Sequence, residues 1–161
     1  MGLDLECTLD ASTPFEKDPV PPTPSMTIDE LLEEFEELGD WDDQCDYLID
    51  LGFELPKLPE TAMTEENKVR GCQNNVWLVA NVSADDPTTL EIVANSDAII
   101  VNGLIAVLLA MYSRKTADEI LAVDPRNVFG RLGLERHLSP LRRNGLFSMV
   151  QRIRDIAEQA A

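Results

Sequence analysis

Apolar side chains recur at helical spacing in two neighbouring segments of the chain, residues 27–38 and residues 41–53. In each segment they fall on one face, as expected for a helix packed on a core. Thr27 and Glu30 form a capping-box pair at the start of the first segment, where two backbone amides need acceptors. Cys45 lies on the apolar face of the second segment. The pattern therefore predicts two amphipathic helices, with Cys45 as a small residue of the core.

Strict alternation of apolar and other side chains replaces the helical spacing after these segments. It runs through residues 75–82, where one face is wholly apolar and the other is partly so. The turn-forming sequence SADDP follows at residues 83–87, and the alternation resumes over residues 90–94. Two alternating segments joined by a short turn predict an antiparallel β-hairpin.

Helical patterns make up the rest of the chain. Residues 98–112 are almost wholly apolar, too few to span a bilayer, and carry Asn102 and Gly103, which favours a buried helix. A second capping box over residues 116–119 and a short segment after Pro125 precede a last amphipathic helix. Its inward face is formed by Leu146, Met149, Val150, Ile153 and Ile156. Helices, a small antiparallel sheet and further helices predict a two-layer α+β domain, with the sheet packed against helices.

The first 25 residues are rich in proline and in acidic side chains. They hold five of the ten prolines of the chain and offer too little apolar surface to offset the entropy lost on ordering. The sequence therefore predicts a disordered, acidic, proline-rich tail over residues 1–25. The remaining residues, 26–161, are enough for one compact domain with a core of its own.

Charge is divided unevenly along the chain. Residues 1–66 carry a net charge of −18, whereas residues 67–161 carry +1. Nucleic acid and an anionic membrane surface are both disfavoured as partners, because binding to either needs a basic surface. A solvated surface and a docking patch for a basic partner are both open interpretations of the acidic half.

The chain has three cysteines, Cys7, Cys45 and Cys72, and they form no CxxC pair and no paired framework. The sequence therefore predicts free thiols in a reducing compartment. No secretory leader pattern opens the chain, so a cytoplasmic location is expected. A metal site would have to combine these cysteines with His137, and their spacing matches no known pair of ligands. No metal is predicted.

Cys72 lies between Gly71 and Gln73, at the mouth of the predicted hairpin. A glycine at this point can adopt a backbone conformation closed to other residues, so the loop can display a side chain. Two interpretations stay open: a buried inert cysteine, and a reactive thiol whose ionised form is favoured by a cation nearby. The candidate cations are Lys68, Arg70 and the Arg142–Arg143 pair. A hydrolase dyad of Cys72 and His137 is a weaker third alternative, since a cap or core role fits His137 better.

Four stretches of the chain together resemble one protein family. They are GCQNNVWLV at 71–79, SDAIIVNGLIAVLLAMY at 96–112, TADEIL at 116–121 and LGLERHLSPLRRNGLFSMVQRIR at 132–154. Their order, spacing and secondary-structure setting are similar to those of the SufE proteins, which are sulfur acceptors for cysteine desulfurases. The upstream stretch WDDQCDYLIDLGFELPKLPE also fits, so the resemblance covers about residues 27–160. It implies a fold similar to SufE and to the iron-sulfur scaffold protein IscU.

The resemblance implies a function for Cys72. This residue stands where the family has the cysteine that accepts a persulfide, with Gly71 and Gln73 shaping the loop. Asn74 replaces the serine usual in the family. Arg142 matches an arginine of the family's HLSPxR stretch, which implies contact with the loop or with the desulfurase. The chain is then a covalent persulfide carrier and an activator of its partner, and not an enzyme by itself.

The resemblance also implies partners. The donor would be a SufS-like cysteine desulfurase, which holds pyridoxal phosphate, and the recipient a SufBCD-like iron-sulfur scaffold complex. The chain itself would need no cofactor. A CsdE-like paralogue that relays sulfur to another acceptor, for example in transfer-RNA modification, is an alternative, as is a plain interaction module. We further expect a resting Cys72 to be turned inward against groups such as Trp77 and Leu78, since an exposed thiolate would be oxidised.

Overall fold

The computed structural model describes residues 27–160 apart from residues 73 and 84–85. The predicted tail over residues 1–25 lies outside the described residues, and so does Gln73. Both predictions therefore stay untested by the structure.

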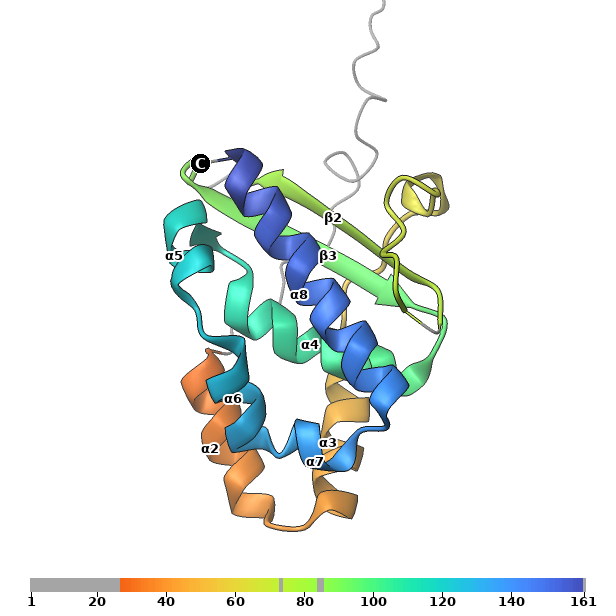
Figure 1. Ribbon diagram of the computed structural model, residues 1–161, viewed down its shortest axis with the longest axis vertical. Helices are drawn as coiled ribbons and strands as arrows, with labels where there is room; N and C mark the ends of the chain where they lie inside the picture. The colour runs from red at the N-terminus through yellow and green to blue at the C-terminus, as the bar shows by residue number, and fades with distance from the viewer. Residues whose placement is uncertain (1–26, 73, 84–85, 161) are drawn as a thin grey trace, which may run out of the picture.

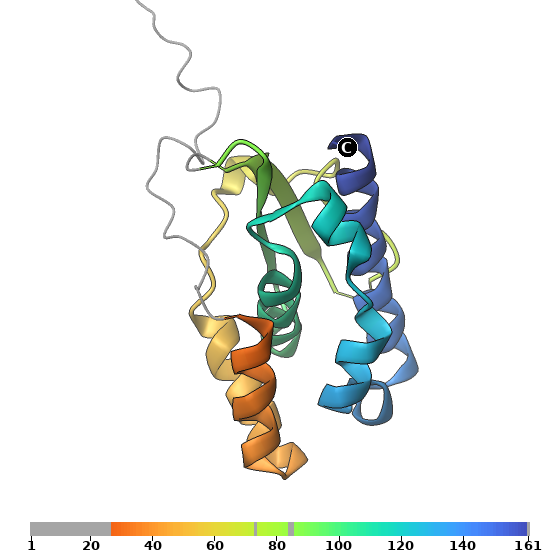
Figure 2. The same cartoon turned by 90° about the vertical axis from the view of Figure 1, so that its left-hand side faces the viewer.

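The two amino-terminal helices begin and end as the sequence predicts. Helix α2 spans Ile28–Leu38, starts at the Thr27 capping box and ends at Gly39, which has a left-handed backbone with φ of 70°. Helix α3 spans Trp41–Phe53 and is capped by the carboxylate of Asp40. Figure 2 shows these helices as an antiparallel pair at one end of the molecule.

The predicted antiparallel hairpin is present. Strand β2 (Val76–Val82) pairs antiparallel with β3 (Thr89–Ser96), so that Val76 faces Ser96 and Val82 faces Leu90. A third strand, β4 (Lys115–Thr116), extends the sheet in the order β2-β3-β4. The sequence did not predict β4, because two residues are too few to show alternation.

The central helix α4 (Ile99–Tyr112) packs on both the sheet and α3. Its crossing with α3 is close: a Cβ added at Gly52 would lie 2.7 Å from the amide nitrogen of Gly103. A short 3-10 helix, η2 (Glu60–Ala62), precedes the sheet. Three short helices follow it, namely α5 (Ala117–Ala122), α6 (Pro125–Leu132) and α7 (Leu134–His137). Helix α8 (Pro140–Ala160) completes the domain and crosses one face of the sheet in Figure 1.

These elements confirm the predicted two-layer α+β class. Leu146, Met149, Val150 and Ile153 of α8 are buried as predicted, and Tyr112 and Leu48 are fully buried at the centre. In Figure 2, α2 and α3 lie on one side of α4 and α8 lies on the other.

Two predictions about individual residues are wrong. Cys45 is only half-buried and is not part of the buried core. For His137 the core alternative is wrong, because the side chain is exposed, and its ring stacks on that of Trp41 with centroids 4.4 Å apart. The stack joins α7 to α3, and α7 itself was not predicted because four residues do not show helical periodicity.

Candidate functional site

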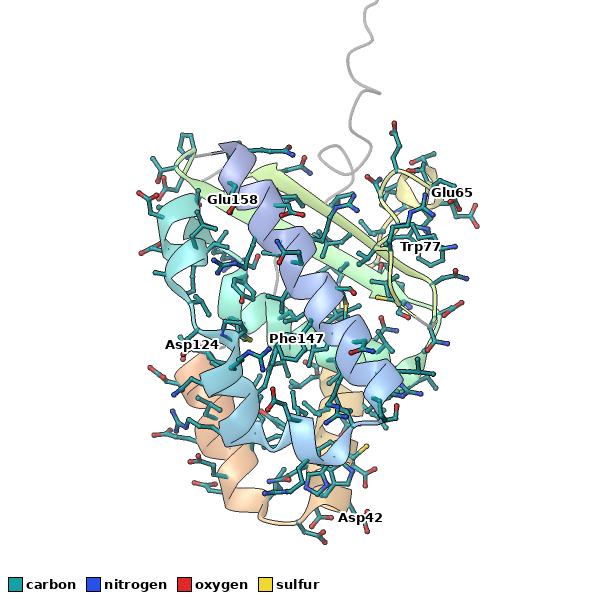
Figure 3. The ribbon with its side chains drawn as sticks, in the orientation of Figure 1. Asp42, Glu65, Trp77, Asp124, Phe147 and Glu158 are labelled. Atoms are coloured by element: carbon teal, nitrogen blue, oxygen red, sulfur yellow. The ribbon has the colours of Figure 1, made fainter. Side chains whose placement is uncertain are left out.

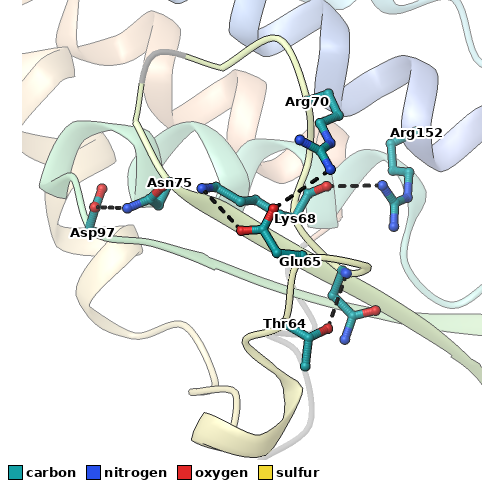
Figure 4. A network of polar contacts seen from close by, with 8 residues as sticks. Thr64, Glu65, Lys68, Arg70, Asn75, Asp97 and Arg152 are labelled. Carbon is teal, nitrogen blue, oxygen red and sulfur yellow. Dashed lines mark hydrogen bonds and ion pairs between the residues drawn. The ribbon is translucent and has the colours of Figure 1, made fainter.

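The loop that carries Cys72 is held at both ends by hydrogen bonds. Before the loop, the amide of Val69 donates to Val76 O at 2.8 Å, and the amide of Leu78 donates to Asn67 O at 2.9 Å. After it, the Asn75 side chain donates to Asp97 at 2.9 Å. These contacts fasten the loop to the start of β2, and Figure 4 shows the one between Asn75 and Asp97.

A side chain of α8 also holds the segment that precedes Cys72. The guanidinium of Arg152 donates to the carbonyl oxygens of Lys68 at 3.3 Å and Glu66 at 2.7 Å. Lys68 and Arg70 both approach the carboxylate of Glu65, at 3.8 and 3.7 Å. The segment before Cys72 is thus tied to the helix that also shields the thiol.

Gly71 has the special backbone conformation that the sequence suggested. Its φ is 88°, in the region that side chains disfavour. A Cβ added there would lie 2.5 Å from Ser148 Oγ on α8. Glycine is therefore required at position 71 for two reasons, the backbone angle and the close approach of α8.

Cys72 is half-buried and faces Gly145 of α8. Its thiol donates to the carbonyl oxygen of Gly145 with an Sγ–O distance of 3.5 Å. A Cβ added at Gly145 would lie 3.5 Å from Cys72 Sγ, an ordinary van der Waals distance, so the cysteine packs directly on this turn of the helix. Trp77, by contrast, pairs with Lys68 through an isolated β-bridge.

A small pocket of about 20 Å³ lies beside the thiol. Its lining residues come from the Cys72 loop and from β2, α4 and α8: Cys72, Asn74, Val76, Val101, Leu104, Leu141, Arg142, Gly145, Leu146 and Met149. The pocket is thus apolar apart from Asn74, Arg142 and the thiol. The expected shielding groups Trp77 and Leu78 do not line it, whereas Leu141, at its edge, is 57% exposed.

The environment of Cys72 favours the neutral thiol. Burial raises the pKa of the Cys72 thiol, and no charge among the described residues lowers it. Of the candidate cations, Lys68 and Arg70 pair with Glu65 and Arg143 donates to the Glu135 carbonyl, so none of these three lowers the pKa of Cys72 in this conformation. The thiol is therefore protonated and unreactive at neutral pH in this state.

Arg142 is brought to the site as the sequence suggested. It lines the pocket beside Cys72, and its Nη1 is buried without a hydrogen-bond partner among the described residues. Its charge also reaches Cys45, whose pKa is raised by burial, Asp46 and Asp42, and is lowered by Arg142. Arg142 thus has a donor free for a group that enters the pocket.

Other candidates from the sequence are not brought together with Cys72. Neither Cys45 nor His137 lines its pocket, so the structure gives no support to a hydrolase dyad. Among the described residues there is no group of three or more His, Cys, Asp and Glu side chains that could hold a metal. No helix in the described part of the chain is long and apolar enough to cross a membrane.

Sequence reasoning missed Gly145 and Ser148, which form the α8 side of the site. A signal for Gly145 was present, because glycine inside a helix costs about 1 kcal/mol relative to alanine and needs a packing reason. Nothing in the local pattern marks Ser148, whose importance arises only from its approach to Gly71.

Comparison with known proteins gives a consistent set of similarities. Residues 29–157 match the family described as SufE, Fe-S metabolism associated domain. Uncharacterized SufE-like proteins of Rhizobium meliloti (strain 1021) and Rhizobium etli are each 46% identical to the chain, over 134 and 136 residues. These matches cover 82% and 84% of this chain and 95% and 92% of the relatives.

A solved structure has the same fold. The solution structure of a hypothetical protein from Thermus thermophilus superposes with a TM-score of 0.67 at 22% identity, and covers 84% of this chain and 98% of that one. At this identity the likeness establishes the fold alone.

Proposed function

The chain belongs to the SufE family, which is associated with Fe–S metabolism, and on that premise we propose that Cys72 accepts persulfide sulfur from a cysteine desulfurase. The observation that carries the proposal is the position of Cys72. It lies on a loop with a required glycine, beside a small pocket that also contains a free arginine donor. A merely structural cysteine would need neither the pocket nor the donor.

The proposed step is an exchange of sulfur between two thiols. The Cys72 thiol loses its proton, and the thiolate attacks the terminal sulfur of a cysteine persulfide on the desulfurase. A new S–S bond forms on Cys72 while the S–S bond on the desulfurase breaks. The desulfurase cysteine leaves as a thiolate and takes up the proton, so the exchange has no net oxidation or reduction.

The pocket is of a size to shelter the transferred atom. A volume of about 20 Å³ exceeds the roughly 10–15 Å³ that one water molecule requires, and a persulfide adds a single atom to the thiol. Val76, Leu104 and Met149 would surround that atom with apolar groups and exclude water. Arg142 Nη1 is the donor available to a negatively charged persulfide there, or to a group of the desulfurase.

The resting conformation is protected and not reactive. Since burial raises the pKa of Cys72 and its thiol faces Gly145, the loop must move before a desulfurase persulfide can reach Sγ. Leu141, exposed at the edge of the pocket, offers an apolar contact for a partner that draws the loop out. We propose that docking of a SufS-like desulfurase causes this movement and so activates the thiol.

The later steps rest on family membership alone. We propose that the sulfur passes to a SufBCD-like scaffold in the cytoplasm, and that the chain holds no cofactor of its own. A CsdE-like relay to another acceptor has the same first step, so the structure of the site does not favour one recipient over the other.

Alkylation kinetics test the proposed movement. Cys72 should react slowly with a bulky maleimide in the free chain and much faster when a catalytically inactive desulfurase is added. Cys45 is the internal control, and its alkylation should not accelerate, because acceleration at both thiols would indicate general loosening of the fold. Equal rates at Cys72 with and without the partner would overturn the shielded resting state.

A further inference from the structure

One edge of the sheet is left open at the far end of β2. In the β2–β3 register, odd-numbered residues of β2 bond to β3, as the flanking contacts from Ser83 N to Thr89 O and from Asp97 N to Asn75 O indicate. Even-numbered residues direct their backbone groups to the other side, where Leu78 N donates to Asn67 O. The amide N–H groups of Ala80 and Val82 therefore point outward from the free edge of the sheet.

No described residue pairs with this part of the edge. The segment of residues 67–69 covers β2 only as far as Leu78, through the single bridge between Lys68 and Trp77. Beyond it, Val82 is 57% exposed. An open edge of this kind is a template for another strand, and proteins usually cover it.

A groove lies along the same open edge. It has a volume of about 530 Å³ and is bounded by residues 78–81 of β2 and by the carboxyl-terminal half of α8. Its apolar lining residues are Leu78, Val79, Ala80 and Ile156, and its polar ones are Asn67, Asn81, Arg152, Asp155 and Gln159. Figure 1 shows α8 crossing β2 at this end, and Figure 3 places Glu158 there. The combination of a free edge and a half-apolar groove fits an extended peptide.

The first nine residues have the pattern of such a peptide. Leu3, Leu5, Cys7 and Leu9 alternate with Asp4, Glu6 and Thr8. Period-two alternation is typical of a strand with one covered face, and the first proline comes only at position 14. The segment differs in this respect from the proline-rich residues that follow it, and its alternation departs from the disorder that composition predicts for residues 1–25 as a whole.

Reach and charge are both compatible with binding of this segment to the groove. Residues 10–26 span up to about 56 Å when extended, well above the radius of gyration of about 15 Å for a domain of this size. Residues 67–161, which form the sheet and α8, carry a net charge of +1 and so do not repel an acidic segment, while in the groove itself Arg152 and Asp155 balance each other. A second copy of the chain is a poorer occupant, because two chains of net charge −17 repel each other.

We propose that residues 3–9 add to the free edge of β2 as an extra strand. The three leucines would cover Ile156 and the apolar part of the groove, and the acidic side chains would face solvent. The backbone would supply acceptors for the amides of Ala80 and Val82. This docking is separate from sulfur acceptance at Cys72 and does not depend on it.

Amide hydrogen exchange of the full chain, followed residue by residue by NMR, tests the proposal. The amides of Ala80 and Val82 should be protected, and Leu5→Asp should speed their exchange by at least about tenfold, because it places a charge against the groove. Val20→Asp is the matched control, since it makes the same change outside the segment and should leave both rates unaltered. Leu5→Ile should keep the protection.

Three results would overturn the proposal. Fast exchange of Ala80 and Val82 in the full chain would mean that the edge is uncovered. Protection that survives Leu5→Asp would mean that another part of the chain covers it. Protection that rises with protein concentration would identify a second copy as the occupant.

Discussion

Replacement of Gly71 by alanine tests whether the Cys72 loop is built as described. The variant suffers two separate penalties. One is the backbone angle, because φ is 88° and side chains disfavour this region. The other is steric, because the new Cβ would lie 2.5 Å from Ser148 Oγ and 3.3 Å from Ser148 Cβ.

The two penalties can be estimated separately. A left-handed backbone costs a residue with a side chain about 1–2 kcal/mol. Turning Ser148 away from its preferred rotamer costs about 0.5–1.5 kcal/mol more. The sum is about 1.5–3.5 kcal/mol in the free energy of unfolding, and each kcal/mol lowers Tm by about 2–4 °C for a chain of this length.

Two other glycines separate these contributions in thermal unfolding followed by circular dichroism. Gly39 also has a positive φ, of 70°, but a Cβ there would meet nothing within 4 Å, so Gly39→Ala measures the backbone cost alone. Gly130 lies in α6 with neither constraint, so Gly130→Ala should leave Tm unchanged or raise it by helix propensity.

The expected order of stability is Gly130→Ala, then Gly39→Ala, then Gly71→Ala. Adding Ser148→Ala to Gly71→Ala should recover part of the loss, since it removes Oγ. If Gly71→Ala were as stable as Gly130→Ala, the described loop geometry would be refuted. If it only matched Gly39→Ala, the contact with Ser148 would carry no cost.

Two further predictions concern the reactivity of the site. Burial raises the pKa of Cys72, so the rate of its alkylation in the free chain should rise only at pH values above the usual thiol pKa of about 8.5. A pH-rate curve typical of an exposed thiol would contradict this burial. Arg142→Met should leave Tm within a few degrees but slow sulfur acceptance from a desulfurase. Arg136→Met, at an exposed position outside the pocket, should leave the rate of sulfur acceptance unchanged. Equal rates for both variants would remove Arg142 from the site.

Local signals in the sequence predicted most of the elements. The capping boxes at Thr27 and Thr116 fixed two helix starts, since they depend only on residues three apart. Alternation predicted the hairpin, and the structure supplied its register. Strand β4 and helix α7 escaped because each is shorter than the period needed to recognise it.

The candidate site was predicted only in part, because local sequence pattern does not show which distant elements pack together. Motif and loop chemistry marked Gly71, Cys72 and Arg142, but the wall of the pocket comes from α8, and Gly145 lies 73 residues from Cys72 in the chain. Such an approach is a property of packing, and its one local trace is a glycine inside a helix, which does not say what packs against it. Cys45 shows a second limit of sequence patterns. It lies on a helix face that is apolar in sequence, but no element covers all of that face, so the cysteine is only half-buried.

Sulfur acceptance at Cys72 is tested most directly by mass spectrometry after incubation of the chain with a cysteine desulfurase and free cysteine. Trypsin cleaves after Lys17, Lys57, Arg70 and Arg114, so each of the three cysteines falls in a different peptide. We predict the added mass of sulfur on the peptide of residues 71–114 alone. It should be lost in Cys72→Ser and kept in Cys45→Ala. Added sulfur on the peptide of Cys45 or Cys7, with residues 71–114 unmodified, would contradict the role of Cys72.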